Sequence, residues 1–203
     1  MSSSVKSGPI PAGRLQRGSS SSDNHISKFR QVLIRHGLTM TVIAIVCLFA
    51  PFILDGFNSS LDKFFIFPSR YFVWFLGVAL FIFGYLKFTK KYLNVRQIAW
   101  ISYLFLISVV EEIGFRLGLP LLFTSELIGI DTFWIGVILS NLIFASIHYF
   151  TLRWKITACV FTFLGGMGFS RLFSVTDDLA LVILVHWAVT FLNTPSAPKG
   201  LNN

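Results

Sequence analysis

Five ionisable side chains lie inside long apolar runs of this sequence, where a membrane would make each of them costly. They are Glu111, Glu112, Arg116, His148 and His186. A charged residue at the centre of a bilayer costs about 2.5 to 3.5 kcal/mol, so such residues are usually paired with one another or functional. Carboxylate and imidazole groups in a dry cavity are those that general acid–base catalysis uses. These five residues are the candidate functional site.

The two adjacent glutamates are expected to differ in role. On a helix, Glu112 and Arg116 are four residues apart with the acid nearer the N-terminus, which is the favourable order for an ion pair. Glu111 is turned by about 100° from Glu112 and is poorly placed to share the same guanidinium. A purely structural ion pair does not need two acids for one arginine. We therefore expect Glu112 to hold Arg116, and Glu111 to take part in proton transfer.

Two further apolar runs carry polar residues at helical spacing. In one run, Asn141 and His148 share a stripe with Phe144 at i, i+3 and i+7. In the other run, the stripe at i, i+4 and i+7 consists of His186, Thr190 and Asn193. Each set lies on one side of a helix. Together with Glu111 they could activate water and stabilise an oxyanion. The asparagines and histidines could instead serve only as hydrogen bonds between helices.

The elements that must position these residues are predicted to be transmembrane helices. The chain has 203 residues, of which 54% are hydrophobic and 13% charged, with a mean hydropathy of +0.72. Apolar runs recur at 38–55, 70–87, 97–119, 133–151, 156–173 and 179–195. Only helices or closed barrels satisfy the backbone in lipid, and these runs lack strand alternation. The sequence predicts an all-α, polytopic membrane helix bundle of about six transmembrane helices, the third ending or kinking at Gly118 and Pro120.

These bounds create one difficulty for the candidate site. If the third and fourth helices stood upright, Glu111 and His148 would differ in depth by about 14 Å. We therefore expect the third helix to sit deeper in the membrane than its hydropathy suggests.

The termini are predicted to lie outside the membrane domain. Residues 1–37 are rich in Ser, Gly and Pro and are expected to form a disordered, basic, cytoplasmic tail in which His25 and His36 are solvated. Residues 38–195 form the transmembrane domain, and residues 196–203 a short C-terminal tail. With the N-terminus in the cytoplasm, thirteen of the seventeen Lys and Arg residues lie on that side, so both termini are expected there. The net charge of +8 thus indicates orientation in a lipid bilayer and no nucleic-acid partner.

Three motifs resemble a known family. The segment EEIGFR, residues 111–116, fits EExxxR, and FASIH, residues 144–148, fits FxxxH. A third histidine, His186, follows a glycine-bearing helix. Over roughly residues 97–195 these motifs resemble the CPBP family of CAAX proteases and bacteriocin-processing enzymes. The resemblance implies a multi-pass, metal-independent glutamate endopeptidase that needs no cofactor and acts on a membrane-associated peptide, either a prenylated chain or a precursor tail.

The resemblance also implies roles for individual residues. Glu111 and His148 would activate water, while Glu112 and Arg116 would support the helix that carries Glu111. The third motif is usually HxxxN and stabilises the oxyanion, but Thr190 stands here at the asparagine position. A threonine hydroxyl donates one hydrogen bond and is shorter than an amide, so the contact is expected to be weaker. Asn193, one turn further, is the residue that could compensate.

Three other functions remain compatible with these residues. The chain could be a non-catalytic immunity or scaffold member of the same family, or a proton-coupled carrier, since buried Glu and His also build proton relays. It could also be a metal hydrolase with Glu111, His148 and His186 as ligands, although an HExxH-type spacing is lacking. The few spans and short loops favour a bacterial plasma membrane, and the endoplasmic reticulum is compatible as well.

Overall fold

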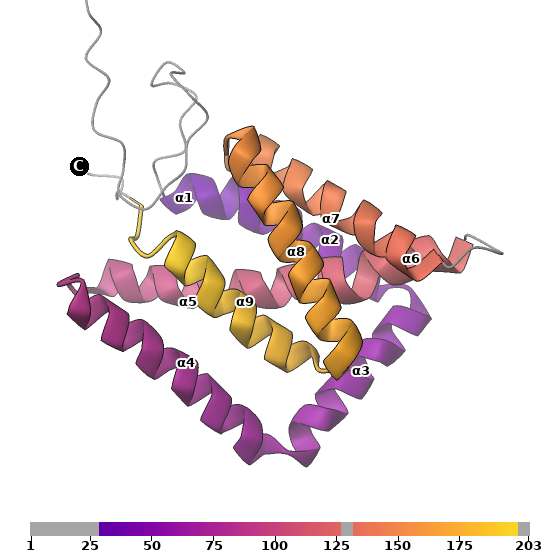
Figure 1. The fold of residues 1–203 in the computed structure, drawn as a ribbon, viewed down its shortest axis with the longest axis horizontal. Helices are drawn as coiled ribbons and strands as arrows, with labels where there is room; N and C mark the ends of the chain where they lie inside the picture. Colours follow the sequence, from indigo (N-terminus) through magenta and orange to yellow (C-terminus); the bar gives the residue numbers. More distant parts are fainter. Residues whose placement is uncertain (1–28, 127–131, 199–203) are drawn as a thin grey trace, which may run out of the picture.

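A computed structural model describes residues 29–126 and 132–198, and this part of the chain is helical, with no strand among the described residues (Figure 1). Its elements are α1 (Phe29–Val32), the π-helical η2 (Leu33–Gly37), α2 (Leu38–Leu48), α3 (Pro51–Ile66), α4 (Pro68–Phe88), α5 (Val95–Glu112), the π-helical η3 (Ile113–Gly118), α6 (Leu119–Glu126), α7 (Thr132–Thr151), α8 (Ile156–Thr176) and α9 (Leu179–Asn193).

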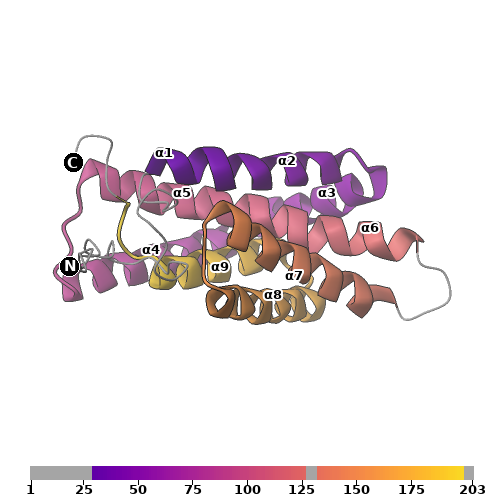
Figure 2. The same ribbon diagram turned by 90° about the horizontal axis from the view of Figure 1, so that it is seen from above.

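Within residues 29–126 and 132–198, five helical stretches are long and apolar enough to cross a membrane. They are Phe29–Leu48, Pro68–Phe88, Val95–Thr124, Phe133–Thr151 and Ile156–Thr176, and α9 is a shorter apolar helix. The start of α1 and the end of α9 lie towards the same side of the bundle (Figure 2). The prediction of a polytopic helical membrane bundle is confirmed. Which side faces the cytoplasm stays a prediction from the charges.

The first membrane helix begins nine residues earlier than expected. Elements α1, η2 and α2 form one helical stretch from Phe29 to Leu48, and a separate helix starts at Pro51. A proline is favourable in the first turn of a helix and cannot continue the preceding one, which explains the break. Residues 29–37 therefore belong to the helical domain and not to the expected tail. Residues 1–28 and 199–203 of the two expected tails lie outside the described residues.

The third helix does not end at Gly118 or Pro120 but continues to Glu126. Pro120 has no N–H, and in the π-helical register that N–H would bond the carbonyl of Phe115. The Ser140 hydroxyl donates to this carbonyl at 2.8 Å, and Arg116 Nη1 donates to it at 3.2 Å. Because side chains satisfy the carbonyl, the helix passes the proline without a break in the membrane.

This longer helix also removes the expected difference in depth between the candidate catalytic residues. It forms an antiparallel hairpin with α7, against which α6 packs (Figure 1). Fifteen residues separate Glu111 from Glu126 at the end of α6, and sixteen separate Thr132 at the start of α7 from His148. Residues equally far from the turn of a hairpin face each other, so Glu111 and His148 meet at the same level.

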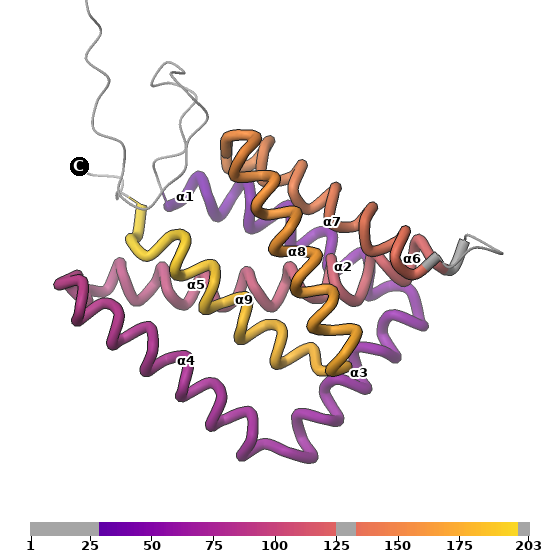
Figure 3. The backbone as a smooth tube through the Cα atoms, viewed as in Figure 1, coloured from indigo at the N-terminus to yellow at the C-terminus, as the bar shows by residue number. Residues whose placement is uncertain are grey.

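The helix that carries both glutamates runs through the centre of the bundle. It is flanked by α1 and α2 on one side, while α8 lies on the opposite side of the bundle and α9 crosses it (Figures 2 and 3). At Gly118 the contact with α2 is so close that an added Cβ would lie 2.6 Å from the Cβ of Cys47. A side chain at position 118 would push α2 away from the central helix.

Candidate active site

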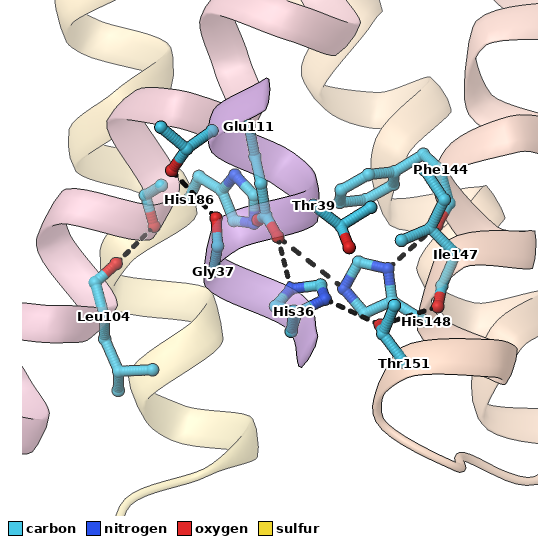
Figure 4. A network of polar contacts seen from close by, with 12 residues as sticks. His36, Gly37, Thr39, Leu104, Glu111, Phe144, Ile147, His148, Thr151 and His186 are labelled. Atoms are coloured by element: carbon cyan, nitrogen blue, oxygen red, sulfur yellow. Dashed lines mark hydrogen bonds and ion pairs between the residues drawn. The ribbon is translucent and has the colours of Figure 1, made fainter. Parts of the chain in front are cut away.

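The carboxylate of Glu111 lies at the centre of three histidines (Figure 4). Its Oε1 atom is 2.8 Å from Nε2 of His36 and 3.8 Å from Nε2 of His148. Its Oε2 atom is 3.4 Å from Nε2 of His186. All four side chains are buried. Three residues that the sequence singled out on three different helices thus converge on one point.

The fourth member of this cluster, His36, was expected to be solvated, and that prediction is wrong. The side chain is only 3% exposed. Its ring packs edge-on against the ring of His148, with 4.7 Å between the two ring centres. Arg30 and Arg35 interrupt the apolar character before residue 38, so hydropathy alone misses this part of the helix. The sequence signal lies in the spacing, because Val32, His36 and Met40 follow one another at i, i+4 and i+8 and are all buried.

The tautomers of His148 and His186 follow from what their Nδ1 atoms contact. In His148, Nδ1 lies 2.8 Å from the carbonyl oxygen of Phe144, which can only accept. In His186, Nδ1 lies 2.6 Å from Oε1 of Glu112. Both Nδ1 atoms therefore carry the proton and donate. The Nε2 atoms of both rings are turned towards Glu111.

The tautomer of His36 follows from a hydroxyl group. Its Nδ1 lies 2.9 Å from Oγ1 of Thr151, whose single proton is donated to the carbonyl of Ile147 at 2.7 Å. The hydroxyl must therefore accept, and Nδ1 of His36 must donate. A neutral His36 would then set the lone pair of Nε2 against a carboxylate oxygen of Glu111 at 2.8 Å. Two acceptors do not approach so closely, so one proton lies between them.

The same proton balances the buried charge of the cluster. Glu111 and Glu112 are 2% and 0% exposed, and Arg116 is 3% exposed. Two carboxylates and one guanidinium leave one negative charge that burial in a membrane would make costly. With one additional proton between His36 and Glu111, the cluster is neutral.

The expected contact between Glu112 and Arg116 is present. Nε of Arg116 lies 3.2 Å from Oε2 of Glu112, at the distance of an ion pair but without the direction of a hydrogen bond. The guanidinium also lies 5.1 Å from the centre of the Phe144 ring. Because Glu112 accepts the Nδ1 proton of His186 as well, it orients a candidate catalytic residue in addition to pairing with the arginine.

Asn141 links three elements behind this site. Its Oδ1 accepts from Arg116 Nη1 at 3.0 Å, and its Nδ2 lies 3.1 Å from Oγ of Ser170 on α8. An added Cβ at Gly166 would lie 2.0 Å from this Oδ1, so a glycine is required at that helix crossing. Asn141 therefore positions Arg116 from behind, and it does not contact Glu111.

The cluster forms part of the wall of a cavity of about 340 Å³, a size within the range of small-ligand sites. His36, Glu111, His148 and His186 line it together with Thr190 and Asn193 of α9, which the sequence had placed on the stripe of His186. Thr190 is half-buried and Asn193 is exposed. Much of the remaining wall is aromatic, including Trp100, Trp154, Phe161 and Phe169.

Residues 93–192 match the model of a family described as type II CAAX prenyl endopeptidase Rce1-like. This region belongs to the Rce1-like family. The match agrees with the resemblance to the CPBP family, and it covers Glu111, His148 and His186 but not His36. Neither a curated protein nor a solved structure matches the chain. The Rce1-like region and the five apolar spans together identify an integral membrane protein that carries a domain of a protease family.

Proposed function

We propose that the protein is a glutamate-type intramembrane endopeptidase in which Glu111 activates the hydrolytic water. The observation that carries this proposal is the convergence of three Nε2 atoms on one buried carboxylate at the wall of a cavity. Such a group of proton acceptors within reach of one another suits general acid–base chemistry. The Rce1-like match supports a peptide bond as the bond that is cleaved.

In the proposed first step, Glu111 and His148 hold a water molecule between them. The 3.8 Å between Oε1 and Nε2 is too long for a direct hydrogen bond and leaves both groups available to the water. Glu111 takes a proton from the water, and the oxygen attacks the carbonyl carbon of the substrate. His36 keeps its own proton against Oε1, so the incoming proton goes to Oε2.

In the proposed second step, that proton moves from Oε2 of Glu111 to Nε2 of His186, which is 3.4 Å away. Glu112 stabilises the resulting imidazolium through Nδ1, as the buried acid does in a catalytic triad. The Nε2–H group of His186, with the hydroxyl of Thr190, then stabilises the oxyanion and passes the proton to the leaving amine. Water is consumed, and the peptide bond becomes a carboxylate and a protonated amine, which together hold both protons of the water.

The proposed substrate is a membrane-associated peptide that carries an apolar group, either a prenylated chain or a precursor tail. The aromatic walls of the cavity favour such a group over a charged peptide, because burying an unpaired charge there would be costly. The description of the family as prenyl endopeptidases favours the prenylated chain.

The test compares Glu111→Gln with Asp62→Asn, a matched loss of a carboxylate at an exposed position of α3. The purified protein in liposomes is given a fluorogenic prenylated peptide after treatment with a chelator. We expect Glu111→Gln to lower kcat by about 10² to 10⁴, the contribution of a general base, and Asp62→Asn to leave it unchanged.

Two results would contradict the proposal. Cleavage by Glu111→Gln at the rate of the unchanged protein would exclude this residue as the base. Proton-driven uptake into the liposomes without any cleavage would identify a carrier.

A further inference from the structure

We propose that His36, Glu111 and His148 form a binding site for a divalent transition-metal ion of the Zn²⁺ type, and that the bound ion switches the peptidase off. The binding site stands on geometry alone, whereas the inhibition rests on the proposed function.

The three side chains each offer one ligand atom at suitable separations. One ring nitrogen of each histidine and a carboxylate oxygen of Glu111 all lie within 4.8 Å of one another. Figure 4 shows the carboxylate beside the rings of His36 and His148. In a tetrahedral zinc site with ligands at about 2.0 to 2.1 Å, two ligand atoms are about 3.3 Å apart. The distances from Oε1 of Glu111 to Nε2 of His36 and to Nε2 of His148 are 2.8 Å and 3.8 Å, one below and one above this value. Shifts of under about 1 Å would bring the three atoms around one ion.

In both histidines, the Nδ1 atom makes the kind of hydrogen bond that is common in histidines that bind a metal through Nε2. A histidine that binds a metal through Nε2 usually donates its Nδ1–H to a carbonyl, a carboxylate or a hydroxyl, which fixes the ring and the tautomer. His148 makes this contact to the Phe144 carbonyl, and His36 makes it to the Thr151 hydroxyl. The rings are therefore held with Nε2 facing the same point before any ion arrives.

The chemistry of the ligand set selects the class of ion. Two imidazole nitrogens and one carboxylate oxygen suit Zn²⁺ and its neighbours in the first transition row, whereas Mg²⁺ and Ca²⁺ prefer oxygen ligands alone. The ion would take the place of the proton between His36 and Glu111. Its remaining coordination position faces the cavity, from which the ion would enter.

Occupation of this site removes the groups that the proposed reaction needs. The ion would hold a carboxylate oxygen of Glu111 and Nε2 of His148, which are the two atoms assigned to the hydrolytic water. The water would then lose its place between these two atoms, and the positive charge of the ion would make the carboxylate a weaker base. The inference thus predicts a peptidase that is active without metal and inhibited by Zn²⁺ at a single site that includes a residue outside the Rce1-like region.

The test measures binding and activity separately on the full chain in lipid nanodiscs after removal of metal. Titration with Zn²⁺ by calorimetry, and with Co²⁺ by visible absorption, is expected to show one ion with tetrahedral coordination. His36→Gln is expected to weaken binding by at least about tenfold to 100-fold. The matched control is His186→Gln, because His186 lies outside the three-residue set and its loss should change Zn²⁺ binding less than tenfold. Thermal unfolding of both variants checks that they are folded.

Each outcome decides one part of the inference. Equal binding of Zn²⁺ by folded His36→Gln and the unchanged protein, or a larger loss in His186→Gln, would overturn this site. Faster cleavage with added Zn²⁺ would overturn the inhibition. If Zn²⁺ binds as expected but the metal-free protein cleaves no peptide, the metal site stands and the proposed function fails.

Discussion

Glu111 and Glu112 are neighbours in the sequence but have different partners. Glu112 contacts Arg116 and the Nδ1 proton of His186, while Glu111 faces three Nε2 atoms. The cause is the turn of about 100° between consecutive helical residues, which points the two carboxylates at different helices. His186 contacts both acids. It therefore links the ion pair of Glu112 and Arg116 to Glu111, the proposed base.

Thr190 is the residue at which the sequence departs most clearly from the family pattern, and its hydroxyl is the group to test. Thr190→Val keeps the shape of the side chain but removes its hydroxyl donor, and an oxyanion donor is worth about 10² to 10³ in kcat. We expect a tenfold or greater loss of kcat with little change in KM. Thr190→Asn, which restores the pattern, is expected to raise kcat. Steady-state cleavage of the reporter peptide measures both, and an unchanged kcat for Thr190→Val would remove this residue from the mechanism.

Among the elements, η3 determines the path of the helix that carries Glu111 and Glu112. It follows the two glutamates directly and leads into Pro120, which would otherwise break the helix in the membrane. The Phe115 carbonyl, left without the N–H of residue 120, is bound from α7 by Ser140. The hairpin of α6 and α7 that brings His148 to Glu111 therefore depends on a side chain contributed by its own second helix.

This dependence predicts a non-additive pair of substitutions. Ser140→Ala leaves a buried carbonyl poorly satisfied and is expected to cost about 1 kcal/mol of stability or more. In the background of Pro120→Ala, the new N–H of residue 120 can bond the same carbonyl, so the loss should be clearly smaller. Reversible unfolding in mixed micelles of the two single variants and the double variant measures the coupling. Equal losses in both backgrounds would show that Ser140 does not replace the missing N–H.

For the whole molecule, the candidate site extends beyond the region that matches the Rce1-like family, because His36 lies outside residues 93–192. The stretch α1 to α2 supplies His36 to Glu111, and it supplies Val32 and Met40 to the core that also contains Trp100 and Phe144. The first membrane helix is thus part of the site as well as part of the fold.

The matching prediction concerns fragments of the chain. Residues 93–203 expressed alone should insert in the membrane but fail to cleave the reporter peptide. In this fragment Glu111 lacks its contact with His36, and the core lacks Val32 and Met40. Co-expression with residues 1–92 should restore cleavage, since separately inserted helices can associate in the bilayer. Full activity of the fragment 93–203 alone would show that the first helices are dispensable. A His36→Gln version of the fragment 1–92 tests whether the imidazole is needed for this rescue.

The sequence by itself determined the fold class, the five apolar helices that follow residue 67, and the list of buried ionisable groups in the matched region. The expected run 38–55 was wrong in its bounds, because it runs past the end of α2 into the start of the separate helix α3. The correctly predicted features follow from the cost of placing polar groups in lipid, which acts locally and is readable from composition and helical spacing. The pairing of Glu112 with Arg116 was equally readable, because residues four apart on one helix are always neighbours.

Only the tertiary structure decided that His36 is buried against Glu111 and that the third helix passes Pro120. Both depend on contacts between residues far apart in the chain. The neighbouring cations Arg30 and Arg35 suggest that the segment of His36 is exposed to solvent. In the structure, packing against α5 buries this side chain. Pro120 is tolerated because Ser140, twenty residues further on, reaches the carbonyl that the proline leaves free. The spacing of residues within one helix does not predict which side chains a neighbouring helix will place against them.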